Sequence, residues 1–140
     1  MLLRLVLILG LLGLVGCSSM GISDQPLYEL QQRYGNEQSR YMQLGSLTLH
    51  YRDEGNRDGP ALVLLHGVAS SLHTWDGWVA ELAPHYRIIR LDLPAHGLTG
   101  PDVGRERYDI DCMLDVLAPL TQPLPVTKFA LAGHSLGGYT

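Results

Sequence analysis

The sequence predicts an α/β fold in which a β-hairpin is followed by parallel βαβ units. Three short, largely apolar runs at 61–65, 86–91 and 128–132 are typical of buried strands, and segments with helical periodicity separate them. Strands that alternate with helices of about a dozen residues indicate a parallel sheet. The third run leads directly into a glycine-rich turn at 133–138, and ligands bind at such strand ends in open α/β sheets.

The composition is that of a globular protein with one modest domain or part of a larger one. The chain has 140 residues, of which 46% are hydrophobic and 17% charged, and this excludes a disordered or collagen-like chain. The formal net charge of −4 and the lack of a basic run argue against nucleic-acid binding.

The first 16 residues are expected to be a signal peptide. Arg4 is followed by the apolar stretch 5–15, which fits a secretory signal and is shorter than the roughly 20 residues that span a bilayer. A buried core helix is the less favoured alternative, because the segment is N-terminal and ends abruptly in polar residues.

The end of this segment, Leu-Val-Gly-Cys at 14–17, resembles the lipobox of bacterial lipoproteins. The resemblance implies that Cys17 carries lipid and anchors the protein to a bilayer, since two or three acyl chains anchor stably. Ser18 rather than Asp follows the cysteine. In such lipoproteins this implies an outer-membrane location in the cell envelope, facing the periplasm. Cys17 is therefore not paired with Cys112, which we expect to be a small buried hydrophobe in a helix.

Residues 17–40 are expected to form a polar tether that ends where the folded domain, 41–140, begins. A short helix is predicted within the tether over 27–34. Asp24 is a possible N-cap of that helix, because a side-chain oxygen at this position can accept from the first backbone N–H groups.

A β-hairpin opens the domain, with strands predicted at 41–44 and 47–52 around a Gly-Ser turn. A cluster of turn-forming residues at 55–60 follows the second strand. Three apolar residues of the second strand alternate with polar ones and give the strand one apolar face: Leu47, Leu49 and Tyr51.

Three further strands are predicted to pair in parallel. The run 61–65 is continuously apolar, which indicates a strand that is buried on both faces of the sheet. The run 86–91 is interpreted in the same way, although Arg87 and Arg90 interrupt it. The run 128–132 is the third strand of this kind.

Two helices are predicted between these strands. The first begins at Ser70 or Ser71, either of which can cap it, and runs to about Leu82. Its two aromatic residues are expected in the core: Trp75 and Trp78. After a loop at 92–104, the second helix spans 108–120, and five apolar residues form one side of it: Ile110, Met113, Leu114, Leu117 and Leu120.

The turn after the third parallel strand carries the clearest catalytic signal. Residues 133–137 read Gly-His-Ser-Leu-Gly, and they follow a strand where a helix should begin, which is the setting of a nucleophile elbow. Gly133 and Gly137 are expected to be required, since side chains two residues before and after Ser135 would collide in so sharp a turn. Ser135 is therefore the candidate nucleophile, exposed at the C-terminal edge of the sheet.

A second element agrees with this interpretation. His66-Gly67 ends the first parallel strand, and the backbone N–H groups of Val68 and Leu136 are the candidate oxyanion hole. The alternative for Ser135 is a turn serine in a nucleotide-binding loop. The dinucleotide fingerprint would place Gly at this position, and no Walker A lysine is present.

Three motifs together resemble those of the α/β-hydrolase superfamily: His66-Gly67, Asp-Leu-Pro-Ala-His-Gly at 92–97, and 133–138. The resemblance covers 41–140 and is to the branch with small esterases, lipases, cofactor-free haloperoxidases, epoxide hydrolases and proline iminopeptidases. Epoxide hydrolases carry Asp where this chain has Ser135. The resemblance therefore implies a serine hydrolase that cleaves an ester, thioester or amide of a small-molecule acyl substrate through an acyl-enzyme. Ala95 stands where the family usually has Gly, a difference that matters chiefly where φ is positive.

Other polar residues near these motifs are expected to have structural roles. His66 and His96 would hydrogen-bond loop backbone, and Asp92 would brace its own loop. His134 would point away from the nucleophile and is therefore not the catalytic base. The six histidines show no metal-ligand spacing, so we expect no metal site, and no cofactor is expected.

In this superfamily the chain order is nucleophile, acid and histidine, which implies that the acid and base lie beyond residue 140. The 140 residues are accordingly expected to be the N-terminal half of the domain, truncated after the elbow. We expect them to be inactive and poorly folded by themselves, with 128–132 as an exposed apolar edge. Two alternatives stay open: a non-catalytic lipoprotein that uses the fold as a binding module, and an acyltransferase or perhydrolase with the same acyl-enzyme.

Overall fold

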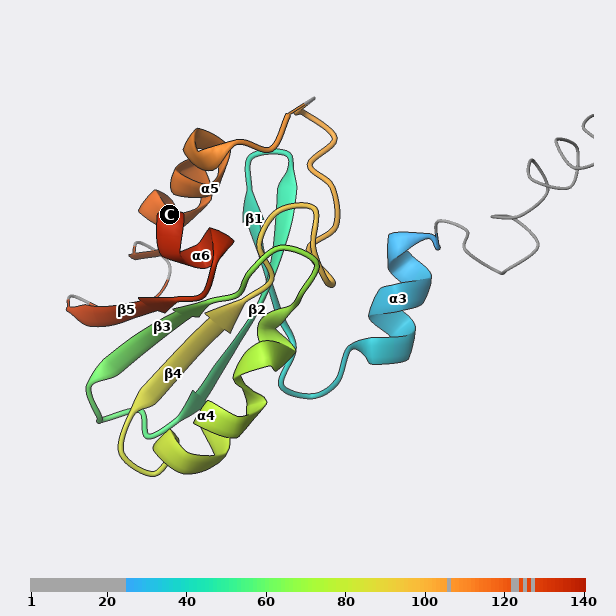
Figure 1. Cartoon of the computed structure of the whole chain (residues 1–140). Helices are drawn as coiled ribbons and strands as arrows, with labels where there is room; N and C mark the ends of the chain where they lie inside the picture. Colours follow the sequence, from blue (N-terminus) through green and yellow to red (C-terminus); the bar gives the residue numbers. More distant parts are fainter. Residues whose placement is uncertain (1–24, 106, 122–123, 125, 127) are drawn as a thin grey trace, which may run out of the picture.

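The computed structural model describes residues 25–140 apart from 106, 122, 123, 125 and 127. The predicted signal peptide, Cys17 and Asp24 lie outside the described residues. The described chain forms a five-stranded mixed sheet in the order β1-β2-β4-β3-β5 (Figure 1). Its strands are β1 (Arg40–Leu44), β2 (Leu47–Gly55), β3 (Ala61–Leu65), β4 (Arg87–Leu91) and β5 (Phe129–Gly133).

The strand pairing confirms the predicted α/β architecture. β1 and β2 form the hairpin, and β2 pairs antiparallel with β4. β3 lies between β4 and β5 and pairs with both in parallel. The three strands predicted to be parallel are therefore adjacent, and β5 is at the edge of the described sheet.

Helical segments cover both faces of the sheet. The 3₁₀ helix η1 (Leu72–Trp75) and α4 (Asp76–Leu82) lie on one face, and α5 (Ile110–Leu117) lies on the other (Figure 1). The core under η1 and α4 comprises Leu62, Leu64, Trp75 and Ile88. The larger core under α5 includes Leu49, Val63, Leu65, Ile89, Leu91, Met113 and Val116. Successive residues of β3 and β4 thus point into opposite layers, which explains why these strands read as continuous apolar runs.

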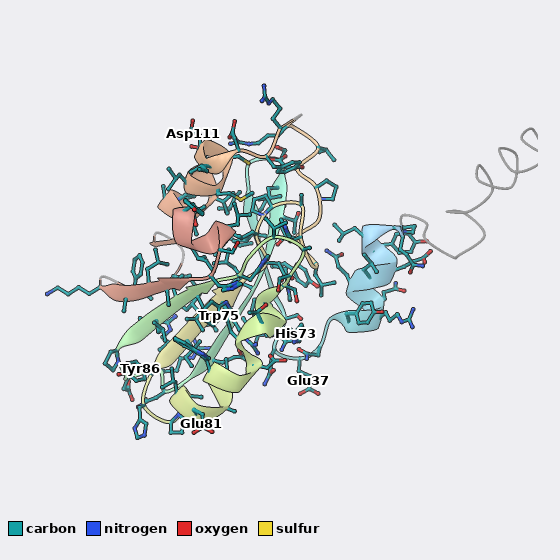
Figure 2. The ribbon with its side chains drawn as sticks, in the orientation of Figure 1. Glu37, His73, Trp75, Glu81, Tyr86 and Asp111 are labelled. Carbon is teal, nitrogen blue, oxygen red and sulfur yellow. The ribbon has the colours of Figure 1, made fainter. Side chains whose placement is uncertain are left out.

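The first predicted helix is divided into η1 and α4. Ser71 caps η1, since its hydroxyl accepts the N–H of His73. Trp75 is buried and packs on the sheet (Figure 2), but the expectation that Trp78 lies in the core is wrong, because its side chain is 49% exposed. Trp75 already occupies the space over the sheet, and the ring of Trp78 packs edge-on against it, 5.1 Å away between centroids.

The second predicted helix is shorter than the predicted span 108–120, and its buried side differs from the predicted one. α5 begins after Asp109, which caps it by accepting the N–H of Cys112, and the chain then continues as the 3₁₀ helix η2 (Ala118–Thr121). The buried residues are Cys112, Met113 and Val116, so the prediction for Cys112 is confirmed. Ile110 and Leu114, which were expected on the buried side, are 46% and 44% exposed.

The exposure of Leu114 has its cause in β5. In the part of the chain that the structure describes, this strand pairs with β3 along one edge only, and Phe129 and Leu131 are 43% and 50% exposed. Together with Leu114 and Leu117 they line an open apolar cavity of about 320 Å³ between α5 and β5. The predicted apolar edge at 128–132 is thus present, and Leu114 faces this cavity, while Met113 and Val116 of the same helix pack into the core.

The polar side of β2 is also buried, which the alternating pattern did not indicate. His50 and Arg52 are 1% and 4% exposed, because η1 and the 92–100 loop cover this side of the hairpin. The charged residues of the neighbouring strands are paired: Arg87 with Asp53, at 2.7 Å, and Arg90 with Glu54, at 2.7 Å. These ion pairs allow two arginines inside an otherwise apolar strand.

The helix predicted at 27–34 is present as α3 (Leu27–Tyr34), with Pro26 at the N-cap position. It packs against the loop that follows β4. Leu27 lies close to Gly100, and the side-chain amide of Gln31 donates to the carbonyl of Leu98 at 3.2 Å. The helix within the predicted tether is therefore in contact with the domain.

Candidate active site

Ser135 occupies the sharp turn between β5 and α6 (Leu136–Tyr139), at the end of the sheet where β3 and β4 also end (Figure 1). Its φ and ψ are 52° and −115°, a combination that non-glycine residues rarely adopt, and the residue is exposed. Such a backbone costs on the order of 1–3 kcal/mol and persists only where the surroundings hold it. The turn has the strained strand-to-helix geometry of a nucleophile elbow.

Backbone hydrogen bonds hold this turn against β3. The N–H of His134 donates to the carbonyl of Leu65 at 3.0 Å, and the N–H of Gly137 donates to the carbonyl of His66 at 3.1 Å. A Cβ on Gly133 would run into the carbonyl of Gly137, which is the collision expected from the sequence. A Cβ on Gly137 would run into the carbonyl of Leu65, so glycine is also required by the neighbouring strand.

The candidate oxyanion hole lies on the side of the elbow that faces the end of β3. Gly67 packs on Ser135 so closely that a Cβ on Gly67 would lie 3.1 Å from the serine Cβ. Val68 follows in an exposed loop, and Leu136 opens α6. Within the described residues, neither backbone N–H donates a hydrogen bond. Both N–H groups thus stay candidates for an oxyanion hole beside the serine.

His66 braces the loop beneath the site, as predicted. It is fully buried, and its Nδ1 donates to the carbonyl of Gly67 at 2.7 Å while its Nε2 accepts the N–H of Leu93 at 3.0 Å. Burial lowers the pKa of His66, which favours the neutral ring that can both donate and accept. His96 stacks edge-on against this ring and donates to the carbonyl of Pro94, so it also contacts loop backbone.

Asp92 braces its own loop, which confirms the prediction, and it also holds the start of η1. Its carboxylate accepts the N–H groups of Leu72 and Leu98, each at 2.8 Å. It also accepts Nδ1–H of His50 at 2.8 Å. Burial by itself would raise the pKa of Asp92, but these donors outweigh burial and hold the pKa below its usual value. A Cβ on Gly97 would run into this carboxylate.

His50 is the residue that sequence reasoning missed. Its Nε2 lies 2.9 Å from the hydroxyl of Ser39, so the buried imidazole links the partly exposed Ser39 to the buried Asp92. No sequence motif marks this arrangement, because His50 occupies a polar position of an alternating strand. Only the pairing of β2 with β4 brings it to Asp92.

No described histidine or carboxylate hydrogen-bonds to Ser135. The position of the acid and base beyond residue 140 stays a prediction. In the part of the chain that the structure describes, no cluster of three or more histidine, cysteine or acidic side chains could hold a metal ion. None of the helices described is long and apolar enough to cross a bilayer.

Ala95 has a φ of 62°, so it adopts the left-handed backbone at the position where glycine was expected. Replacing Ala95 by glycine is expected to stabilise the protein by about 0.5–1 kcal/mol. The change removes roughly 1–2 kcal/mol of left-handed strain, and the greater freedom of glycine in the unfolded chain offsets about 0.4–1 kcal/mol of this gain. Urea unfolding of the Ala95→Gly variant, made in the protein produced from its complete reading frame, checks the value.

The matched control is Ala80→Gly, in the exposed middle of α4. This variant should lose about 1 kcal/mol, because glycine is the poorer helix former. If both variants were equally destabilised, Ala95 would not be strained.

Comparisons with known proteins agree with this geometry. The family model of the alpha/beta hydrolase fold matches residues 60–140. The 30 kDa subunit of magnesium chelatase from Rhodobacter capsulatus is 42% identical over 86 residues, which are 61% of this chain and 30% of that protein. Human epoxide hydrolase 4 is 33% identical over 92 residues, covering 66% and 25% of the two chains.

An ester-cleaving protein is also among the relatives. Pimeloyl-[acyl-carrier protein] methyl ester esterase from Nitrosomonas europaea is 35% identical over 94 residues, which are 65% of this chain and 32% of that protein. The crystal structure of the enol-lactonase from Burkholderia xenovorans superposes with a TM-score of 0.64 at 29% identity, covering 71% of this chain and 38% of that one. The chain spans only about a quarter to a third of the length of these curated relatives.

The family model covers more than half of the chain, and it includes the two segments that meet at the elbow, the end of β3 and the turn after β5. The order of the strands fits the same family, and so do Gly133 and Gly137 on either side of Ser135. The chain therefore belongs to the α/β-hydrolase fold family.

Proposed function

We propose that the protein hydrolyses an ester, thioester or amide bond through an acyl-enzyme formed on Ser135. The observation that carries this proposal is the elbow itself: an exposed serine in a strained turn, held against β3 by the bonds of His134 and Gly137. A backbone strain that the surroundings maintain is typical of a residue with a function. A turn serine with only a structural role needs no such conformation.

In the proposed reaction, the hydroxyl of Ser135 attacks the acyl carbon and its proton passes to a base. The N–H groups of Val68 and Leu136 stabilise the oxyanion, and the loss of one such donor typically raises the barrier by about 2.7–4 kcal/mol. The leaving alcohol, thiol or amine takes the proton, and water then cleaves the acyl-enzyme by the same route in reverse. The family resemblance implies that the base and its acid follow later in the sequence.

The relatives support ester chemistry without naming a substrate for this chain. One is a methyl ester esterase and another an enol-lactonase, and both names denote cleavage of an ester bond. Epoxide hydrolase 4 is an equally clear relative. The serine at position 135 favours the acyl-enzyme route. The family resemblance implies that epoxide hydrolases carry Asp at this position instead.

A fluorophosphonate probe tests this proposal directly, because it reacts covalently with activated serines. The protein produced from its complete reading frame should be labelled once, at Ser135, and the Ser135→Ala variant should not be labelled. If the folded protein stayed unlabelled, the non-catalytic binding module would be the better description. Product analysis with water and with competing alcohol or peroxide acceptors then separates hydrolysis from acyl transfer and perhydrolysis.

We also propose that lipid on Cys17 anchors the protein to the bacterial outer membrane. The support is the sequence at 14–17 and the polar residues that follow it. The variant Cys17→Ser is expected to remain an unprocessed precursor that takes up no labelled palmitate, because the thioether to the lipid cannot form. Labelling that is equal in the variant and the unchanged protein would contradict the anchor, and Cys112→Ser, with the signal intact, is the control.

A further inference from the structure

A second cavity lies between α3 and the sheet, away from the elbow. It has a volume of about 710 Å³, within the range of small-molecule sites. Four parts of the chain line it: Arg33 and Tyr34 of α3, His50 and Arg52 of β2, Ser71 and His73 at η1, and the loop after β4. His73 is labelled in Figure 2. Ser135 and the two candidate oxyanion donors are not part of its wall.

Arg52 is the unusual residue of this cavity. Arg52 is only 4% exposed, and its Nε is buried without a hydrogen-bond partner among the described residues. No described carboxylate forms an ion pair with its guanidinium. A buried charge is costly unless it is paired and hydrogen-bonded, so an unpaired guanidinium that lines a cavity indicates a partner that binds there.

The chain's own acids near Arg52 are already in use. Glu54, two residues along the same strand, pairs with Arg90. Asp53 pairs with Arg87, at 2.7 Å, and with Arg57. Asp92 lines the cavity but accepts hydrogen bonds from His50 and from two backbone N–H groups. Arg52 therefore differs from Arg87 and Arg90, its neighbours in the sheet, each of which has a carboxylate of its own.

We propose that this cavity binds a small organic anion whose carboxylate or phosphate group contacts Arg52. A guanidinium presents donors in a planar fork that matches both kinds of oxyanion. Arg33 adds a second positive charge at the side of α3, and the hydroxyl of Ser71 adds a hydrogen-bond donor. Tyr34 and Leu30 provide an apolar wall for the rest of the ligand. The proposal does not depend on the catalytic role of Ser135.

Calorimetric titration with inorganic phosphate and with benzoate tests the site and distinguishes the two oxyanions. Ionic strength is held constant with sodium chloride, and the protein is produced from its complete reading frame. At least one probe should bind saturably. The variant Arg52→Met should lower the affinity by about tenfold or more, and Arg52→Lys, which keeps the charge without the fork, should have an intermediate effect.

Two controls keep the result specific. Arg57→Met removes an exposed arginine outside the cavity and should leave binding unchanged. Ser135→Ala should also leave it unchanged, because Ser135 is not part of the wall of this cavity. Without anion, Arg52→Met should melt at the same temperature as the unchanged protein or higher, because an unpaired buried charge has been replaced by an apolar side chain.

The proposal is overturned if neither probe binds beyond the chloride control, or if Arg52→Met binds as tightly as the unchanged protein. A lower melting temperature of Arg52→Met with unchanged binding would give Arg52 a structural role only. If Arg52→Met does not fold, Arg33→Gln replaces it in the test, because Arg33 is an exposed residue of α3. Loss of affinity by a few fold in this variant supports the site, and unchanged affinity refutes it.

Discussion

Replacing Ser135 by alanine is expected to abolish turnover while the protein stays folded. The loss should be on the order of 10⁶ in kcat, because the covalent step disappears and the remaining members of a triad cannot replace it. Stability should change little. The serine is exposed, no described group hydrogen-bonds to its hydroxyl, and alanine meets the same left-handed backbone. Hydrolysis of p-nitrophenyl esters by the protein from its complete reading frame measures the effect, and circular dichroism verifies the fold.

His134→Gln is the matched comparison, because it changes the neighbouring exposed residue of the same turn. It should retain activity within about tenfold, since His134 is not expected to reach the hydroxyl of Ser135 as a base. Activity of Ser135→Ala within tenfold of the unchanged protein would exclude Ser135 as the nucleophile. A collapse of both variants would instead show that the turn tolerates no change.

Replacing Asp92 by asparagine is expected to destabilise the protein by about 3–5 kcal/mol, because a buried carboxylate loses hydrogen bonds that are each worth about 1.5–3 kcal/mol. The carboxylate accepts from Leu72, Leu98 and His50, and these donors come from three separate segments of the chain. An amide presents one N–H₂ group to these donors, so at least one of them faces another donor. Urea unfolding measures the change. Asp58→Asn, an exposed carboxylate in the turn after β2, should be neutral within about 0.5 kcal/mol.

The pH dependence of this difference gives an independent test. The pKa of Asp92 lies below its ordinary value of 3.8 in the folded protein, so the unfolded chain takes up the proton first as the pH falls. The contribution of the carboxylate to stability is therefore complete above pH 3.8 and is lost as the pH drops through the folded pKa. The unchanged protein and Asp92→Asn should converge in acid. A difference that stays constant down to pH 2 would mean that the charge of Asp92 is not what stabilises the loop.

The elements with local sequence signals could be predicted without the tertiary structure. The hairpin strands at 41–44 and 47–52, the buried strand 61–65 and the elbow at 133–138 follow from alternation, from continuous apolar runs and from glycine spacing, all within a few residues of chain. Side chains repeat every two residues in a strand, and a glycine is needed wherever a Cβ would collide, so these features can be inferred without the tertiary structure. The membership of the family rests on the same local motifs.

Which faces of the strands and helices are covered depends on how distant segments pack. The order of the strands places β4 beside β2, and this buries His50 against Asp92, 42 residues away, and leaves Arg52 in a cavity. Trp78 is exposed because Trp75 fills the space beneath it, and Leu114 is exposed because, among the described residues, it lines an open cavity between α5 and β5. Periodicity predicts that a face is apolar or polar, but burial depends on neighbours that are distant in sequence, so the cover of each face is a property of the packed chain.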